Sequence, residues 1–235
     1  MASKSYVCAI IVAGGSGRRF GNTTKKQFVK IGGKPALYYS VNAFENCSAV
    51  SEIVLVLPKD DLDFYDSVIS KLKEFKKVKK ITEGGKSRQD SVNKGLCKVP
   101  DTTDIVLVHD AARPLVDTRT INRVIEQTKL SDCAICAAPV NDTVKQTGKD
   151  NLIERTVPRD NLWLAQTPQG IRFDLIKQAY QNAADNNISG TDESSLVECL
   201  GIKPVIVQGP KHNIKITTPE DIKLAEFYLK EYADV

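Results

Sequence analysis

The stretch YVCAIIVAGGSGRRFG, residues 6–21, joins a short apolar run to a glycine-rich turn. The run at residues 6–12 has the length and the Val and Ile content of a buried strand. Glycines directly after such a strand let the backbone approach a ligand closely and direct N–H groups at anionic oxygens. The turn lacks the Gly-Lys-Ser/Thr sequence of a P-loop, and Phe20 stands where the dinucleotide fingerprint has its third glycine. These residues therefore predict an anion-binding βα turn outside those two classes.

Similar apolar runs alternate with amphipathic stretches along the rest of the chain. We expect further strands at residues 52–57, 77–82, 104–109, 132–139 and 203–208. We expect helices at residues 35–47, 62–75, 87–97, 117–129, 172–185 and 219–231, the last with Thr218 as its N-cap. This alternation predicts a single α/β domain over residues 1–235, with a mostly parallel sheet covered by helices on both faces.

The composition limits the possible function classes. The 235 residues include 33 Lys and Arg against 29 Asp and Glu, and the resulting net charge of +4 is mild. A protein that binds duplex nucleic acid would carry a larger positive excess on one face, so a small anionic ligand fits better. The apolar runs are too short to span a membrane, and no signal-peptide cleavage site follows the first run. We therefore expect a cytoplasmic protein that binds neither nucleic acid nor membranes.

Six cysteines are too few for a disulfide scaffold in a chain of this length. Cys133 and Cys136 lie three residues apart in a predicted strand, so their side chains should point to opposite faces of the sheet. A zinc site is equally unexpected, because the chain has no second C-x-x-C pair and only two histidines. We expect these two cysteines to be core residues with free thiols.

The segment DTVKQTGKDNLIERTV, residues 142–157, departs from the βα alternation. It is polar, has β propensity, turns at residues 148–151 and leads into no helix, which predicts a protruding β-hairpin arm. A long isolated hairpin is marginal in water, so a second subunit is the natural packing partner. A solvated excursion without any partner is the alternative.

Basic residues follow the glycine-rich turn closely: Arg18, Arg19, Lys25 and Lys26. A triphosphate needs both features, because backbone donors hold its phosphates while Arg and Lys neutralise the charge that builds up at the attacked phosphorus. A solvated basic loop is the alternative.

The motif IVLVHDAARP, residues 105–114, ends a predicted strand in Asp110, at the sheet edge where open α/β folds bind ligands. One such carboxylate beside phosphates is enough to hold Mg²⁺, so Asp110 is a candidate metal ligand. Arg113 adds an anion contact. His109 could be a base, but we favour a structural role, because the sequence shows no partner to orient it.

Two further motifs can bind a nucleotide. In GGKSRQDS, residues 84–91, glycines after a strand and hydroxyls opening a helix could contact a base edge, or Ser87 and Ser91 could only cap the helix. In NIKITTPED, residues 213–221, Lys215 interrupts an apolar alternation, which suggests an anion in a cleft.

Taken in order, these motifs resemble the cytidylyltransferases that act on polyol phosphates, above all those that act on 2-C-methyl-D-erythritol 4-phosphate in non-mevalonate isoprenoid biosynthesis. The resemblance covers nearly the whole chain and rests on AGGSGRR, KKQF, GGKSRQDS, VHDAARP, APVNDTVK, RDNLWLAQTPQ, TDES and NIKITTPEDI. It implies a Rossmann-like nucleotidyltransferase domain that transfers CMP from CTP, releases pyrophosphate and uses Mg²⁺ or another divalent cation.

The resemblance also implies roles at matching positions. The residues that grip the triphosphate would be Arg19, Lys26 and Lys215. The remaining nucleotide contacts would come from Ala13, Gly14, Gly15, Gly85, Ser91 and Ala111, with Asp110 also holding the metal. The polyol phosphate would be bound by Arg113, Thr143, Arg159, Thr167 and Thr191. The resemblance further implies a homodimer in which the arm crosses to the neighbouring subunit. Thr143 and Arg159 would then belong to the neighbour's site. Lys25 and Lys86 depart from the family pattern.

The implied reaction is in-line attack by a phosphate oxygen of the acceptor on the α-phosphorus of CTP. A phosphate monoester is already ionised near pH 7, so no general base is needed. Ribitol 5-phosphate is an alternative acceptor, because pocket shape separates such substrates by only about 1–3 kcal/mol. A nucleotide-binding module without turnover is a further alternative, but binding alone would not need Arg19, Lys26, Asp110 and Lys215 together.

Overall fold

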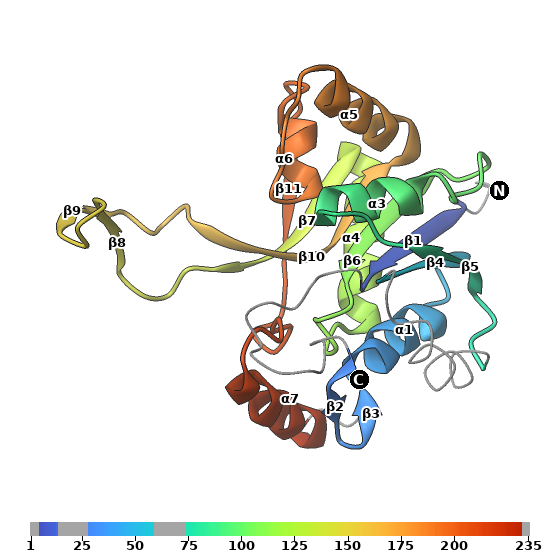
Figure 1. The fold of residues 1–235 in the computed structure, drawn as a ribbon, viewed down its shortest axis with the longest axis horizontal. Coiled ribbons are helices and arrows are strands. Elements are labelled where there is room, and N and C mark those ends of the chain that lie inside the picture. The colour runs from blue at the N-terminus through green and yellow to red at the C-terminus, as the bar shows by residue number, and fades with distance from the viewer. Residues whose placement is uncertain (1–4, 14–27, 59–73, 232–235) are drawn as a thin grey trace.

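A seven-stranded sheet forms the centre of the structure, a computed structural model that describes residues 5–13, 28–58 and 74–231 (Figure 1). The strand order is β11-β7-β10-β6-β1-β4-β5. Six strands lie close to expected positions: β1 (Val7–Val12), β4 (Glu52–Leu57), β5 (Val78–Glu83), β6 (Ile105–Asp110), β7 (Cys133–Pro139) and β11 (Val205–Gln208). The mostly parallel α/β sheet predicted from the sequence is therefore confirmed.

The strand β10 (Trp163–Arg172) was not predicted, and it runs antiparallel between β6 and β7. Its sequence WLAQTPQGIR contains Pro168 and Gly170 among polar residues, a pattern typical of loops. In the structure these polar side chains are buried and hydrogen-bonded, as Gln169 is to Asp192 at 2.8 Å. Tertiary hydrogen bonds therefore override the local sequence signal.

Helices cover both faces of the sheet (Figure 1). One face packs against α1 (Ala36–Asn46) and α4 (Thr118–Ser131). The other packs against α3 (Arg88–Leu96), α5 (Phe173–Asp185) and the short α6 (Glu193–Glu198). Successive residues of β1 alternate between the two sides, with Ile11 in the first cluster and Ile10 in the second.

The helix ends follow sequence signals. Ser87 and Asp90 form a reciprocal capping box at α3, and the Asp117 carboxylate accepts from the Thr120 backbone N–H at α4. The last helix, α7 (Pro219–Glu231), occupies the expected range and packs beside the small hairpin β2 (Lys30–Ile31) and β3 (Lys34–Pro35). The helix expected at 62–75 lies almost wholly outside the described residues.

The predicted arm is confirmed as an antiparallel hairpin of β8 (Val144–Thr147) and β9 (Ile153–Val157). It projects far from the body of the molecule (Figure 1). Its side chains are largely solvent-exposed within this chain, and they include the apolar residues Leu152 and Ile153.

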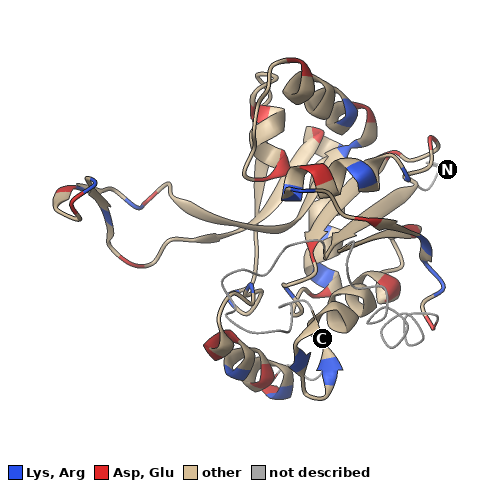
Figure 2. Ribbon diagram, in the orientation of Figure 1, with Lys and Arg blue, Asp and Glu red and all other residues tan. Residues whose placement is uncertain are grey.

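The cysteines and the distribution of charge agree with the expectations drawn from the composition. All six cysteines are free, and burial raises the thiol pKa of Cys133 to about 12 and that of Cys136 to about 11. These two side chains belong to the clusters on opposite faces of the sheet, as expected. Positively and negatively charged residues are interspersed along the described helices, strands and loops (Figure 2). Among the described segments, no helix combines the length and the apolar character needed to cross a membrane.

We predict that Gly170→Ala destabilises the fold by about 1–3 kcal/mol, because the added methyl overpacks the core. A Cβ there would lie 2.3 Å from Thr128 Oγ and 3.0 Å from a methyl of Val124, both on α4. Urea unfolding measures the change. The matched control is Gly148→Ala in the arm, where the nearest atom is the mobile end of Glu154. This control should stay within about 0.5 kcal/mol, and equal losses in both variants would contradict the packing explanation.

Candidate active site

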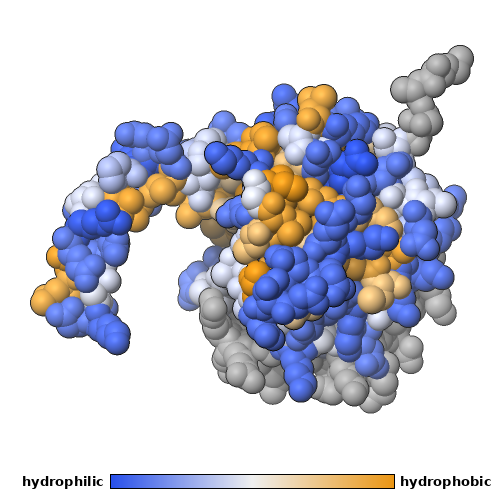
Figure 3. Space-filling view, turned by 90° about the horizontal axis from the view of Figure 1, so that it is seen from above, coloured by the Kyte–Doolittle hydropathy of each residue, from blue (hydrophilic) through white to orange (hydrophobic). Residues whose placement is uncertain are grey.

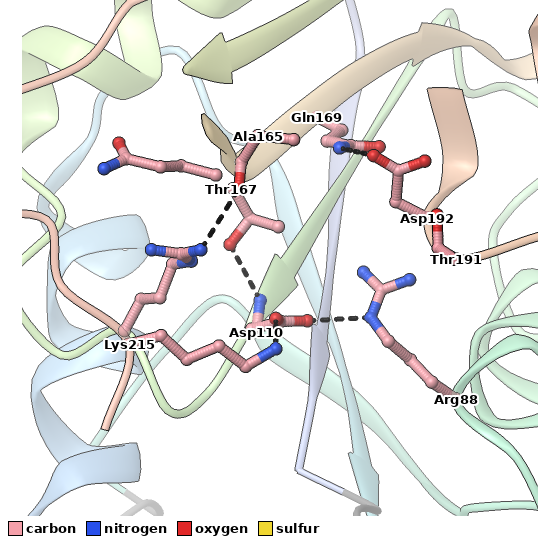
Figure 4. A pocket seen from close by; sticks show the side chains of 10 residues that line it. Arg88, Asp110, Ala165, Thr167, Gln169, Thr191, Asp192 and Lys215 are labelled. Atoms are coloured by element: carbon pink, nitrogen blue, oxygen red, sulfur yellow. Dashed lines mark hydrogen bonds and ion pairs between the residues drawn. The ribbon is translucent and has the colours of Figure 1, made fainter. Parts of the chain in front are cut away.

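A polar cavity of about 230 Å³ opens at the carboxyl end of β6, where β10 passes beside it (Figure 4). Such an edge is where open α/β sheets place their ligands. The lining residues come from separate parts of the chain: Arg88, Asp110, Arg113, Ala165, Gln166, Thr167, Gln169, Thr191, Asp192 and Lys215. The structure therefore brings together Asp110, Arg113, Thr167, Thr191 and Lys215, five of the predicted site residues.

Asp110 is the last residue of β6, and two cations hold its carboxylate. Arg88 Nε donates to Oδ1 at 2.9 Å, and Lys215 Nζ donates to Oδ2 at 2.6 Å (Figure 4). Burial alone would raise the pKa of this carboxyl group, but Arg88 and Lys215 outweigh it and hold the pKa well below its usual range. Asp110 is therefore ionised near pH 7.

Lys215 reaches the cavity because its neighbours are fixed in the core. Ile216 is fully buried against the cluster that includes Ala225, and its backbone N–H donates to the Ala112 carbonyl at 2.8 Å. Lys215, the residue before Ile216, therefore faces the cavity edge beside Asp110. The structure thus places Lys215 and Asp110 at the same cavity.

Arg88 was not predicted as a site residue from the sequence, although it lies inside the motif GGKSRQDS. Its guanidinium makes two parallel hydrogen bonds to Glu193, at 2.8 and 2.9 Å, besides the bond to Asp110. Glu193 is only 1% exposed and also accepts from the Tyr180 hydroxyl at 3.1 Å. An arginine as the first residue of a helix has no local partner, which was the available signal.

Arg113 is a partly buried cation that pairs with no carboxylate among the described residues. Its two terminal nitrogens donate to the carbonyls of Asn213, at 2.8 Å, and Ala165, at 3.3 Å. Burial lowers the pKa of the guanidinium, and its Nε has no hydrogen-bond partner within the described part of the chain. A desolvated, uncompensated cation of this kind favours an anionic ligand.

His109 is completely buried, and both ring nitrogens are engaged. Nε2 lies 3.1 Å from the Arg113 carbonyl, and Nδ1 lies 3.0 Å from Thr167 Oγ. The ring packs against Phe44 with centroids 5.0 Å apart. Burial lowers its pKa to about 3, so the ring is neutral near pH 7. This environment agrees with the structural role favoured from the sequence and supplies the partners that the sequence did not reveal.

The remaining predicted residues fall into four groups. Gly85 and Ser91 meet at the start of α3, where the Gly85 N–H donates to Ser91 Oγ at 3.0 Å. Thr143 and Arg159 are exposed at the base of the arm and do not line the cavity of their own chain. Ala13 and Ala111 are buried beside the ends of β1 and β6. Outside the described residues lie Gly14, Gly15, Arg19 and Lys26.

Comparison with known proteins agrees with this geometry. The family model described as 2-C-methyl-D-erythritol 4-phosphate cytidylyltransferase (IspD) matches residues 7–231. A relative of that name from Syntrophus aciditrophicus is 42% identical over 228 residues, which cover 97% of each chain.

Solved structures give the same result. The chain matches 4-diphosphocytidyl-2C-methyl-D-erythritol synthase from Anaerococcus prevotii with a TM-score of 0.85 and 29% identity, covering 97% of both chains. It matches the 2-C-methyl-D-erythritol 4-phosphate cytidylyltransferase of Francisella tularensis with a TM-score of 0.79 and 34% identity, covering 95% of this chain and 99% of the other. The chain belongs to the 2-C-methyl-D-erythritol 4-phosphate cytidylyltransferase family.

Proposed function

We propose that the protein transfers CMP from CTP to 2-C-methyl-D-erythritol 4-phosphate and releases pyrophosphate, a step of non-mevalonate isoprenoid biosynthesis. Family membership supports this reaction. The structural observation that carries it is the cavity in which an ionised Asp110 meets Lys215 and the uncompensated Arg113. Such a site suits a reaction between two phosphate-bearing substrates.

The chemistry requires two anions to approach each other. A phosphate oxygen of the acceptor attacks the α-phosphorus of CTP, and the bond from that phosphorus to the pyrophosphate oxygen breaks. Lys215, with Arg19 and Lys26 by resemblance, would neutralise the charge that accumulates on the transferring phosphoryl group. Because the acceptor phosphate is already ionised near pH 7, the neutral and fully hydrogen-bonded His109 need not act as a base.

Asp110 fits the role of a ligand for Mg²⁺ or another divalent cation. Its carboxylate is ionised, and each oxygen accepts one hydrogen bond in the structure and keeps further acceptor capacity. Among the described residues, no three His, Cys, Asp or Glu side chains cluster as a metal site. Mg²⁺ often takes most of its ligands from phosphates and water, so a single carboxylate suits it. When bound, the ion would supply further charge neutralisation at the phosphates.

The substrates divide the pocket between them. Ala13, Gly14 and Gly15 would contact the phosphates through the main chain, while Gly85 and Ser91 would read the cytosine and Ala111 would lie near the ribose. Arg113, Thr167 and Thr191 would bind the polyol phosphate. Arg113, Thr167 and Thr191 line the same cavity, which supports their assignment to one substrate.

The arm supports a homodimer as the functional unit. Leu152 is 67% and Ile153 is 63% exposed, and the arm carries hydrophobic patches among its mainly hydrophilic residues (Figure 3). Packing against a second subunit would bury them. Thr143 and Arg159, at the base of the arm, would then complete the neighbour's acceptor site. The free cysteines fit a cytoplasmic enzyme.

The acceptor preference can be measured directly. We expect rapid release of pyrophosphate from CTP and Mg²⁺ with 2-C-methyl-D-erythritol 4-phosphate, and a kcat/KM at least tenfold lower with ribitol 5-phosphate, because pocket shape separates such substrates by about 1–3 kcal/mol. A coupled pyrophosphate assay compares both acceptors. Faster turnover of ribitol 5-phosphate would change the acceptor assignment, and no release with either would leave only nucleotide binding.

We predict that Lys215→Ala lowers kcat more than tenfold while the protein stays folded, since a lost charge contact in the transition state typically costs several kcal/mol. The matched control is Lys177→Ala on α5, whose ammonium lies 4.5 Å from the centre of the Phe173 ring, away from the cavity. Pyrophosphate release and circular dichroism measure both variants. Near-normal turnover by Lys215→Ala would refute its catalytic role.

We predict that Arg159→Ala raises the KM for the acceptor more than the KM for CTP. If Arg159 acts in the neighbour's site, mixing this variant with Lys215→Ala should restore activity. Random exchange makes half of the dimers mixed, and each mixed dimer has one intact site, so about a quarter of normal activity should return. Each variant alone, exchanged with itself, is the control. No recovery after exchange would exclude action across the dimer.

A further inference from the structure

The ring of His109 and three polar groups around it form one continuous hydrogen-bond chain. The Asp110 backbone N–H donates to Thr167 Oγ at 3.1 Å, and Thr167 Oγ lies 3.0 Å from His109 Nδ1. On the other side of the ring, His109 Nε2 lies 3.1 Å from the carbonyl oxygen of Arg113. The ring therefore stands between Asp110 and Arg113, two residues that line the cavity.

The direction of each hydrogen bond follows from the chemistry of the groups. A carbonyl oxygen can only accept, so His109 Nε2 must carry a hydrogen. A neutral ring has one such hydrogen, which leaves Nδ1 as an acceptor, and the Thr167 hydroxyl hydrogen is the one available to it. Thr167 Oγ is then left with lone pairs only and accepts the Asp110 N–H. One tautomer satisfies all three hydrogen bonds, and the other tautomer would lose the bond to the Arg113 carbonyl, because an unprotonated Nε2 has no hydrogen to donate.

This hydrogen-bond chain replaces a backbone hydrogen bond that is missing between β10 and β6. Regular pairing between β10 and β6 ends at Gln169 and Val108, and the register on the other side of β10 shifts between Ala165 and Gln169. The backbone of β10 therefore no longer supplies an acceptor for the last residue of β6. The Thr167 side chain supplies it instead, inside a site where Thr167 is 4% exposed and His109 is fully buried.

We propose that His109 is a positioning residue: its Nε2–H tautomer fixes the Arg113 backbone directly and the Asp110 backbone through the Thr167 hydroxyl. The same hydrogen-bond chain commits the only hydroxyl hydrogen of Thr167 to the ring, so the contact of Thr167 with the polyol phosphate proposed above would come from other atoms of the residue. The kinetic part of this proposal rests on the proposed transferase function.

The hydrogen-bond chain can be tested without any substrate. The sequence has two histidines, so the ring nitrogens of 15N-histidine-labelled full-length protein give two sets of NMR signals, and His109→Gln assigns them. We expect a His109 ring protonated at Nε2, with Nδ1 accepting. Thr167→Val should move the Nδ1 resonance toward that of a nitrogen without a hydrogen bond, and Thr167→Ser should restore it. A ring protonated at Nδ1, or an Nδ1 resonance unchanged by Thr167→Val, would overturn the proposal.

The positioning role is tested by pyrophosphate release. Thr167→Val and His109→Gln should each lower kcat about tenfold, as expected for losing one buried hydrogen bond. Because both act through one chain, the double variant should lose little more than either alone. Thr167→Ser should recover most of the rate. The matched control is Thr128→Val, which removes a fully buried hydroxyl that donates to the Val124 carbonyl within α4, and it should keep kcat.

The outcomes separate the two proposals. Multiplied losses in the double variant, or normal turnover by Thr167→Val with the expected NMR result, would remove the positioning role and leave the transferase function standing. Absence of pyrophosphate release from the unmodified protein would remove the function, while the NMR experiment would still decide the hydrogen-bond chain. If His109→Gln does not fold, the Val and Ser variants of Thr167 decide the kinetics by themselves.

Discussion

The ion pairs at the Asp110 carboxylate are the interaction on which the site depends. This buried charge is tolerated because Arg88 and Lys215 each hold one of its oxygens. Arg88 is itself anchored by Glu193, and Lys215 is anchored by its neighbours in sequence, the buried Ile216 and the partly buried Ile214. Removing one member would leave the remaining charges less well compensated in a partly desolvated pocket, which is unfavourable. The charges therefore specify how α3, α6, β6 and the segment before α7 meet.

The order of the sheet explains why these elements meet at one point. The parallel strands all present their carboxyl ends at the same edge, and β6 lies next to β1, which leads into the glycine-rich turn. The antiparallel strand β10 runs from the base of the arm past the cavity to the start of α5. The strand β10 thus connects the arm, the cavity and α5, which covers one face of the sheet.

Much of this arrangement could be predicted from sequence because it rests on local signals. Apolar runs of Val and Ile identified β1, β4 and β6, and the alternation around Lys215 identified a cation facing a cleft. The chain gives no comparable signal for β10, whose buried Gln166, Thr167 and Gln169 read as loop residues until their distant partners are known. Arg88 was missed for the same reason, since Asp110 and Glu193 lie 22 and 105 residues away along the chain.

The charges around the cavity determine how much negative charge it can accept from its ligands. The described residues there contribute three cations, Arg88, Arg113 and Lys215, and the nearby carboxylates Asp110, Asp192 and Glu193 match them in number. Two of the cations are already paired with those carboxylates, so Arg113 alone remains to meet an incoming anion. One free cation suits one acceptor phosphate, but a triphosphate carries several charges. The basic residues after the glycine-rich turn and a divalent ion on Asp110 are the groups that would supply the difference, which ties the function of the described pocket to Arg19 and Lys26.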